Sequence, residues 1–193
     1  MISSPASAGE EHSPAREERA LPSSEKPLTV IAAMLVSACA PAAAVPLSYD
    51  CDTPPGRLSE LEQVQPGPTY AISGRIRADD LLPDKRWEPA GNVFVESADE
   101  QDRVMLQLIA PERQSPLSIV LRTHHGEKNE LRTLGRIALG EEASFTLAVA
   151  GGRARIEIGT IRAEAAVDLG KDARIGVGCS TGAFRFEGLK FGQ

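Results

Sequence analysis

Apolar and polar residues alternate strictly along residues 143–158, ASFTLAVAGGRARIEI. This period of two is typical of half-buried β-strands. Gly151-Gly152 interrupts it and suits a tight hairpin turn, because both central residues of such a turn take positive φ. A register that pairs Ala150 with Arg153 places every large apolar side chain of the hairpin on one face: Phe145, Leu147, Val149, Ala154, Ile156 and Ile158. A slip of one residue would turn the polar set inward, so the register is well specified.

The chain after residue 44 continues as short apolar or alternating runs separated by Gly, Pro and Asp. This spacing predicts an all-β domain, an antiparallel sandwich or barrel over residues 45–193. One segment, Arg57–Val64, instead has apolar residues at a helix-like spacing and predicts a short helix. The predicted strands outside the hairpin are Tyr70–Ile76, Asn92–Glu96, Arg103–Ala110, Leu117–Thr123, Ile161–Val167, Arg174–Cys179 and Ala183–Phe191.

The first 44 residues differ from the rest of the chain. Residues 1–27 are rich in Ser, Pro, Ala and Glu, which predicts a disordered leader. Residues 28–44 begin with an apolar run of 11 residues, Leu28–Ala38, that is too short to span a bilayer but fits an export signal. Cys39 follows in a lipobox-like VSAC sequence and is the predicted lipidation site, while cleavage near Ala44 is the rival.

The acidic character of residues 1–27 is unusual before an export signal and suggests a true start codon further downstream. The alternative is a disordered cytoplasmic tail with a short buried helix. We expect export, to the periplasm or cell envelope by a lipid anchor, or as a freely secreted protein.

Composition removes several functions from consideration. The formal net charge of -6 argues against a nucleic-acid binder, which normally presents a basic face. No phosphate-binding G-x-x-x-x-G-K motif and no metal-spaced Cys/His cluster is present in the sequence, so neither a cofactor nor a metal is expected. His124-His125 lacks a nearby third ligand.

Three segments together resemble the concanavalin A-like lectin/glucanase superfamily, and within it the family 7 polysaccharide lyases of the alginate-lyase type. They are 107–122, 137–159 and 173–191. The resemblance implies a jelly-roll sandwich and a polysaccharide partner. It matches Gln107 to the family's Gln, which neutralises a uronate carboxylate. Ile109 stands at the position where the family has a His, and Gly178 stands at the position where it has a Tyr. The full catalytic motifs are therefore missing.

Two of the three cysteines lie inside the predicted domain, Cys51 and Cys179. The first and last strands of a jelly roll usually lie near each other, so a disulfide between these two residues is reasonable in an oxidising compartment. The alternative is a pair of free buried thiols.

Alternation also assigns side chains to a second face, turned away from the core. In a jelly roll this concave face binds glycans, and five polar residues are expected on it: Arg75, Arg77, Gln107, Arg122 and His124. The planar guanidinium group suits carboxylates and sulfates. Trp87 lies in a loop from which it could stack on a sugar. The alternative is that these are ordinary solvated strand faces.

These observations together favour a protein that binds an anionic or neutral polysaccharide, with uronate-containing polymers among the candidates. A polysaccharide lyase acting by β-elimination, with His124 or His125 as a rearranged base, is the main alternative. A structural envelope protein without a sugar ligand is the third.

Overall fold

A computed structural model describes residues 46–82, 84–112 and 114–192. Within these ranges the chain forms strands and turns and no α-helix, so none of the described residues belongs to a helix that could cross a bilayer. The strands are β1 (Leu47–Pro66), β2 (Tyr70–Leu81), β3 (Ala90–Ser97), β4 (Asp102–Ile109), β5 (Leu117–His125), β6 (Lys128–Ile137), β7 (Glu142–Ala150), β8 (Arg153–Ile158), β9 (Ile161–Ala166) and β10 (Asp172–Gly192).

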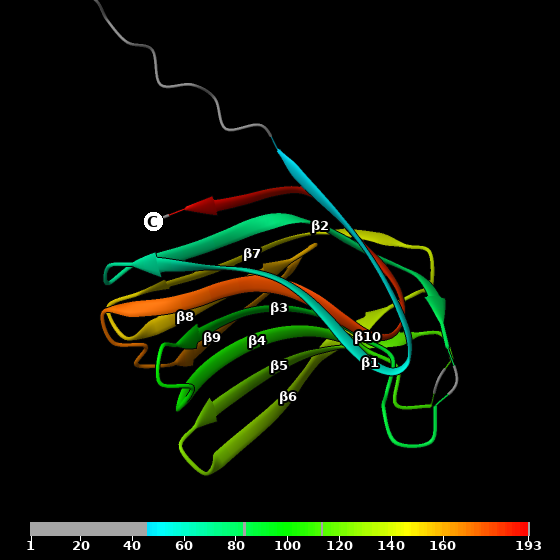
Figure 1. The fold of residues 1–193 in the computed structure, drawn as a ribbon, viewed down its shortest axis with the longest axis horizontal. Coiled ribbons are helices and arrows are strands. Elements are labelled where there is room, and N and C mark those ends of the chain that lie inside the picture. The colour runs from blue at the N-terminus through cyan, green and yellow to red at the C-terminus, as the bar shows by residue number, and fades with distance from the viewer. Residues whose placement is uncertain (1–45, 83, 113, 193) are drawn as a thin grey trace, which may run out of the picture. The chain divides into compact units, whose positions relative to one another are not determined.

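The strands form one antiparallel sheet in the order β6-β5-β4-β3-β10-β2-β7-β8-β9 (Figure 1). The long strand β10 has two different neighbours on one side: its first part, residues 173–180, pairs with β3, and its second part, residues 182–192, pairs with β2. On its other side, β1 accompanies it through both parts. The sheet is therefore divided at β10 into a front layer containing β3–β6 and a back layer containing β2 and β7–β9.

The division falls at a local bend in β10. Thr181 has a positive φ of 53°, a conformation that non-glycine residues adopt infrequently. At the next position, a Cβ on Gly182 would lie 2.6 Å from the carbonyl oxygen of Asp80, so only glycine fits there. The expected strands 174–179 and 183–191 are thus halves of one bent strand.

A single core lies between the two layers. The inward side chains of the front layer include Val93, Leu106 and Ile119, and those of the back layer include Ile72 and Leu147. Burial of this apolar surface provides the main favourable free energy of folding. The architecture confirms the predicted all-β antiparallel sandwich.

The hairpin of β7 and β8 has the predicted register. Ala150 pairs with Arg153, and Phe145 lies opposite Ile158. Gly151 and Gly152 have φ of 56° and 73°, as this turn requires. The alternation therefore identified both the turn and the buried face.

The predicted helix over Arg57–Val64 is wrong. These residues belong to β1, where Leu58 pairs with Ser180 and Val64 with Arg174. Pairing with β10 satisfies the backbone hydrogen-bonding groups of this segment, and this outweighs the weak helical spacing of its apolar residues. The sequence pattern did not predict strand β6, because most of its residues are polar and exposed and show no clear alternation with apolar ones.

The predictions about the N-terminal region, including lipidation of Cys39 and cleavage near Ala44, lie outside the described residues.

A disulfide joins Cys51 to Cys179, as predicted. Cys51 lies opposite Phe184 in β10, beyond the bend, and Cys179 precedes the bend. The hydroxyl of Thr53 lies 2.9 Å from the sulfur of Cys179. The bond therefore links β1 and β10 across the boundary between the layers.

We expect the double substitution Cys51→Ser and Cys179→Ser to lower the free energy of unfolding by roughly 2–5 kcal/mol, because it releases a constraint on the unfolded chain. Urea unfolding of the oxidised parent and the variant measures the difference. The parent under reducing conditions is the control and should lose a similar amount. Equal stabilities of oxidised and reduced parent would contradict a structural role for the bond.

Candidate functional site

The front layer has a recessed face on the side away from the core. Asn92, Met105, Gln107, Ile109 and Val120 point to this side, and each is less than a tenth exposed. Neighbouring side chains therefore cover most of the surface of these five residues. We call this side of the front layer the recessed face. It comprises the outward positions of β3, β4 and β5, together with the residues of β1, β6 and the first part of β10 that lie in line with them across the sheet. A line of directly paired residues across the strands is called a row.

Four buried side-chain atoms on this face have no hydrogen-bond partner among the described residues, and two of them, on Gln107 and Arg122, belong to side chains without an ion pair there. Gln107 is 6% exposed, and its Nε2 donates to Oδ1 of Asn92 over 2.8 Å. Its Oε1 is buried and has no partner among the described residues. On the neighbouring strand, Arg122 is half-buried, and its Nε likewise has no partner in the described part of the chain. Buried polar atoms normally have a partner, so both atoms are candidates for a hydrogen bond to water or to a ligand.

These two side chains lie diagonally across neighbouring strands. Gln107 pairs with Val120 and Met105 pairs with Arg122, so the two polar residues occupy adjacent rows. Diagonal neighbours of this kind stand within reach of long side chains. One ligand can therefore contact an acceptor at Gln107 and a donor at Arg122.

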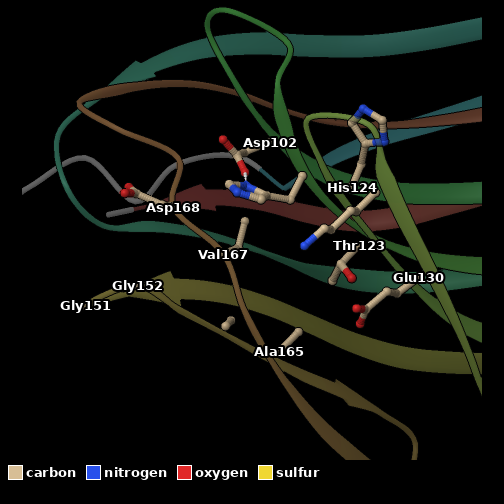
Figure 2. A pocket seen from close by; sticks show the side chains of 12 residues that line it. Asp102, Thr123, His124, Glu130, Gly151, Gly152, Ala165, Val167 and Asp168 are labelled. Carbon is tan, nitrogen blue, oxygen red and sulfur yellow. Dashed lines mark hydrogen bonds and ion pairs between the residues drawn. The ribbon is translucent and has the colours of Figure 1, made fainter.

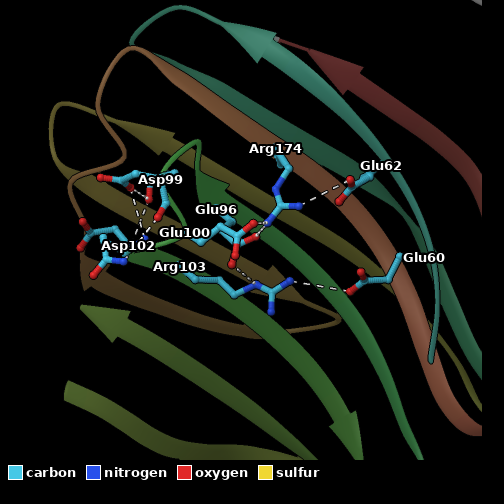
Figure 3. A network of polar contacts seen from close by, with 10 residues as sticks. Glu60, Glu62, Glu96, Asp99, Glu100, Asp102, Arg103 and Arg174 are labelled. Carbon is cyan, nitrogen blue, oxygen red and sulfur yellow. Dashed lines mark hydrogen bonds and ion pairs between the residues drawn. The ribbon is translucent and has the colours of Figure 1, made fainter. Parts of the chain in front are cut away.

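A charged network covers the part of the face next to β1 (Figure 3). Arg103 lies 3.4 Å from Glu96 and 3.7 Å from Glu60, and its guanidinium stacks 4.5 Å from the ring centroid of Phe94. Arg174 contacts three further carboxylates: those of Glu62, Glu96 and Glu100. Both arginines are thus held by protein carboxylates.

Glu60 has the most unusual environment in this network. Burial raises the pKa of its carboxyl, and the nearby carboxylates of Glu62 and Glu96 add to that rise, while the Arg103 guanidinium opposes it. Glu60 was not among the predicted site residues, because its segment was interpreted as a helix. Alternation along β1 would have placed Glu60 and Glu62 on one face.

The face has no room for the tyrosine that the family resemblance places at Gly178. A Cβ at Gly178 would lie 2.7 Å from Cγ of Glu60 and 2.7 Å from the carbonyl oxygen of Ser59. Gly176 is equally constrained, at 2.7 Å from the carbonyl oxygen of Leu61. Strand β1 therefore approaches β10 so closely that Glu60 occupies the space of a side chain at 178.

Arg75 and Arg77 lie elsewhere. Both are on β2, outward from the core formed by Ile72 and Ile76, and so on the outer surface of the back layer. Carboxylates engage both of them: Glu142 and Glu187 lie within 3.2 Å of Arg75, and Asp79 pairs with Arg77. The structure places Gln107, Arg122 and His124 on one face and these two arginines on another. Alternation alone could not predict this separation, because it does not show which layer a strand joins.

The adjacent histidines point to different places. His124 pairs with Arg103 across β4 and β5 and shares the recessed face with Arg122. His125 lies on the other side of β5, where its Nδ1 contacts the carboxylate of Asp102. That contact lies in a cleft of about 760 Å³ at the end of the sandwich, bordered by Thr123 and Glu130 on one layer and by the 151–152 turn and β9 on the other (Figure 2).

Trp87 lies in the loop between β2 and β3 and is 41% exposed. Its backbone nitrogen donates to Asp84, and the carbonyl of the next residue, Glu88, accepts a hydrogen bond from Ser180. Ser180 pairs with Ala90 and Leu58. The Trp87 loop is thereby attached at the border of the recessed face.

Comparisons with known proteins show the fold. No protein-family model matches the sequence, and no curated protein matches it either. Among solved structures, a functionally unknown protein from Saccharomyces cerevisiae aligns with a TM-score of 0.53 and 10% identity, over 69% of this chain and 72% of that one. The alginate lyase from Klebsiella pneumoniae aligns with a TM-score of 0.51 and 10% identity, over 66% of this chain and 60% of that one.

The family 7 alginate lyase AlyA1 from Zobellia galactanivorans is similar at a TM-score of 0.47 and 17% identity, over 68% of this chain and 64% of that one. The chain is similar in fold to the yeast protein and to the Klebsiella lyase. At these identities the likeness concerns the fold.

The raised pKa of Glu60 predicts a pH dependence of stability. A carboxyl whose pKa rises on folding favours the folded state at low pH, and this contribution is lost as the pH rises from the ordinary value of 4.5 through the raised value. We therefore expect Glu60→Gln to gain in melting temperature relative to the parent as the pH increases from 4 to 7. Thermal unfolding at several pH values measures this gain.

Glu157→Gln on β8 is the control, since that residue pairs with Arg162 on the back layer, away from the network. A constant difference between Glu60→Gln and the parent across the pH range would contradict the prediction.

Proposed function

We propose that this protein binds a polysaccharide that carries an acidic sugar, and that the recessed face is the binding site. The observation that carries the proposal is the pair of unsatisfied groups, Oε1 of Gln107 and Nε of Arg122. An acceptor and a cationic donor in adjacent rows match a sugar that bears a hydroxyl next to a carboxylate or sulfate.

The chemistry of each group supports this match. A sugar hydroxyl donates to the carbonyl oxygen of Gln107, whose amide is already oriented by Asn92. The guanidinium of Arg122 binds a carboxylate or sulfate through parallel hydrogen bonds. Val120 and Ile109 form an apolar patch with Ala90 beside these groups, against which the C–H face of a sugar can pack. The jelly-roll fold shared with an alginate lyase adds support from an independent direction.

A polysaccharide lyase is the second candidate, and the position of His124 favours it. This imidazole shares the recessed face with Arg122, two residues before it on β5, so a base and a carboxylate-binding group lie on one surface. Both His124 and His125 line the neighbouring cleft, where His125 contacts Asp102. Lyase products contain an unsaturated uronate that absorbs in the ultraviolet, so incubation with alginate, glucuronan or pectin distinguishes an enzyme from a binder.

Export is part of the proposal. The apolar run Leu28–Ala38 ends at Cys39, and the domain contains a disulfide, which is characteristic of proteins from oxidising compartments. We propose a mature protein that begins at a lipidated Cys39.

Arg122→Ala is expected to weaken polysaccharide binding about tenfold or more, which corresponds to about 1.4 kcal/mol, and to leave the melting temperature nearly unchanged. The loss follows from removal of a charged donor that has no partner within the described residues. Calorimetry with acidic polysaccharides measures the affinity, and thermal unfolding measures stability.

Arg75→Ala is the matched control, because it removes an arginine from the outer surface of the back layer. It should leave the affinity unchanged. Unaltered affinity in Arg122→Ala and Gln107→Ala alike would show that the recessed face is not the site. Loss of affinity in Arg75→Ala alone would move the site to the back layer.

The mature N-terminus tests export. Mass spectrometry of protein isolated from its native cells should find a lipidated Cys39 as the first residue. A mature chain that begins near Val45 without lipid would indicate ordinary secretion, and one that retains residues 1–38 would refute export by either route.

A further inference from the structure

Strand β1 brings two carboxylates onto the face that holds Gln107 and Arg122. Glu60 pairs with Gly178, which pairs with Asn92, so Glu60 belongs to the row of Gln107. By the same pairing, Glu62 belongs to the row of Arg122. Directly paired residues point to the same side of a sheet, so both glutamates face the same molecule that the proposed site would bind.

The charges on the face are unevenly distributed. Beside β1, four carboxylates surround two guanidinium groups and leave a formal charge of -2: Glu60, Glu62, Glu96 and Glu100 with Arg103 and Arg174. Arg122 lies on β5, four strands away from β1, and has no ion pair among the described residues. One end of the face therefore favours an anion, and the other end disfavours it.

The two arginines near β1 are poor ligands for an external carboxylate. Glu96 is 7% exposed and contacts both Arg103 and Arg174. A carboxylate on a ligand would have to displace this buried residue or share its partners with it. Displacement would leave a buried charge without its partner, which is costly.

The carboxylates on β1 cannot easily withdraw. Strand β1 lies against Gly176 and Gly178 so closely that neither position has room for a Cβ. The strand is also paired with β10 along residues 58–66 and joined to it by the Cys51–Cys179 bond. Glu60 and Glu62 are thus held at one border of the face.

We propose that Glu60 and Glu62 are specificity-determining residues of this site, which select a polysaccharide with isolated acidic sugars and disfavour one that is acidic at every sugar. The inference rests on the proposed function. An acidic sugar binds at Arg122, and neutral sugars of the same chain lie toward β1. A polyuronate would instead place further carboxylates beside Glu60 and Glu62.

Distance makes this discrimination effective. Four strand spacings of about 4.8 Å separate Glu62 from Arg122, roughly 19 Å along the sheet. Charges are screened over about 8 Å at physiological ionic strength, so the glutamates act on sugars near β1 and hardly on the one at Arg122. Repulsion of the wrong ligand is a common route to specificity, and here two fixed charges provide it.

The test compares two polymers of different charge density. Hyaluronan alternates a uronate with a neutral N-acetylated sugar, so it brings half as many carboxylates per sugar to Glu60 and Glu62 as alginate, which has a uronate at every position. We expect the parent protein to bind hyaluronan at least tenfold more tightly than alginate in calorimetry at one fixed ionic strength. The double variant Glu60→Gln and Glu62→Gln should bind alginate more tightly and bring the two affinities within about threefold.

A matched control changes the same charge elsewhere. Glu157→Gln and Glu164→Gln remove two carboxylates from β8 and β9 of the back layer and should leave the ratio of affinities as in the parent. Melting temperatures of both double variants show whether each is folded. If the first double variant unfolds, the single variants Glu60→Gln and Glu62→Gln are compared in its place.

The outcomes separate the inference from the proposed function. Tighter binding of alginate by the parent, or an unchanged ratio in the Glu60/Glu62 variant, would overturn the selection of isolated charges while leaving a polysaccharide site at Arg122. Binding of both polymers that is insensitive to Arg122→Ala would overturn the site itself. Binding of neither polymer would reject the proposed function, and the inference with it.

Discussion

The pairing of β10 with three other strands determines the architecture. This strand belongs to both layers, because β3 pairs with its first part and β2 with its second. The change of partner requires the positive φ of Thr181 and the absence of a side chain at Gly182. β1 follows the same bend on the opposite edge, and the disulfide connects the two strands there. The core exists because this two-stranded ribbon holds two layers face to face.

The same ribbon shapes the candidate site. Gly176 and Gly178 allow β1 to approach β10, and this approach places Glu60 where a longer side chain on β10 would otherwise stand. A fold shared with an alginate lyase therefore presents a different set of groups: an amide and an arginine with free hydrogen-bonding capacity, bordered by glutamates. Fold likeness alone would not have revealed that difference, since function depends on the residues placed on the fold.

Much of the fold was predictable from local pattern. The β7–β8 hairpin was recovered to the residue because Phe145, Leu147 and Ile156 alternate strictly around a Gly-Gly turn. The disulfide followed from two cysteines in the first and last strands. β1 was not predictable, because Leu58 and Val64 are exposed and its pairing partner is more than a hundred residues away.

The candidate site was predictable in part, for a related reason. Alternation correctly assigned Gln107, Arg122 and His124 to the side of their strands away from the core. It could not show that Arg75 belongs to the other layer, since a strand's layer depends on long-range pairing. The contribution of Glu60 was hidden for the same reason, as its place on the face depends on the partner of β1.

The pairing of the first strand with the last has a consequence for how the protein is made. A ribosome releases β1 long before β10 exists, and neither layer has its connecting strand until the end of the chain emerges. Contacts between such distant segments form slowly, because a long loop must close before they are made. The two layers are therefore expected to be joined only after β10 has been synthesised.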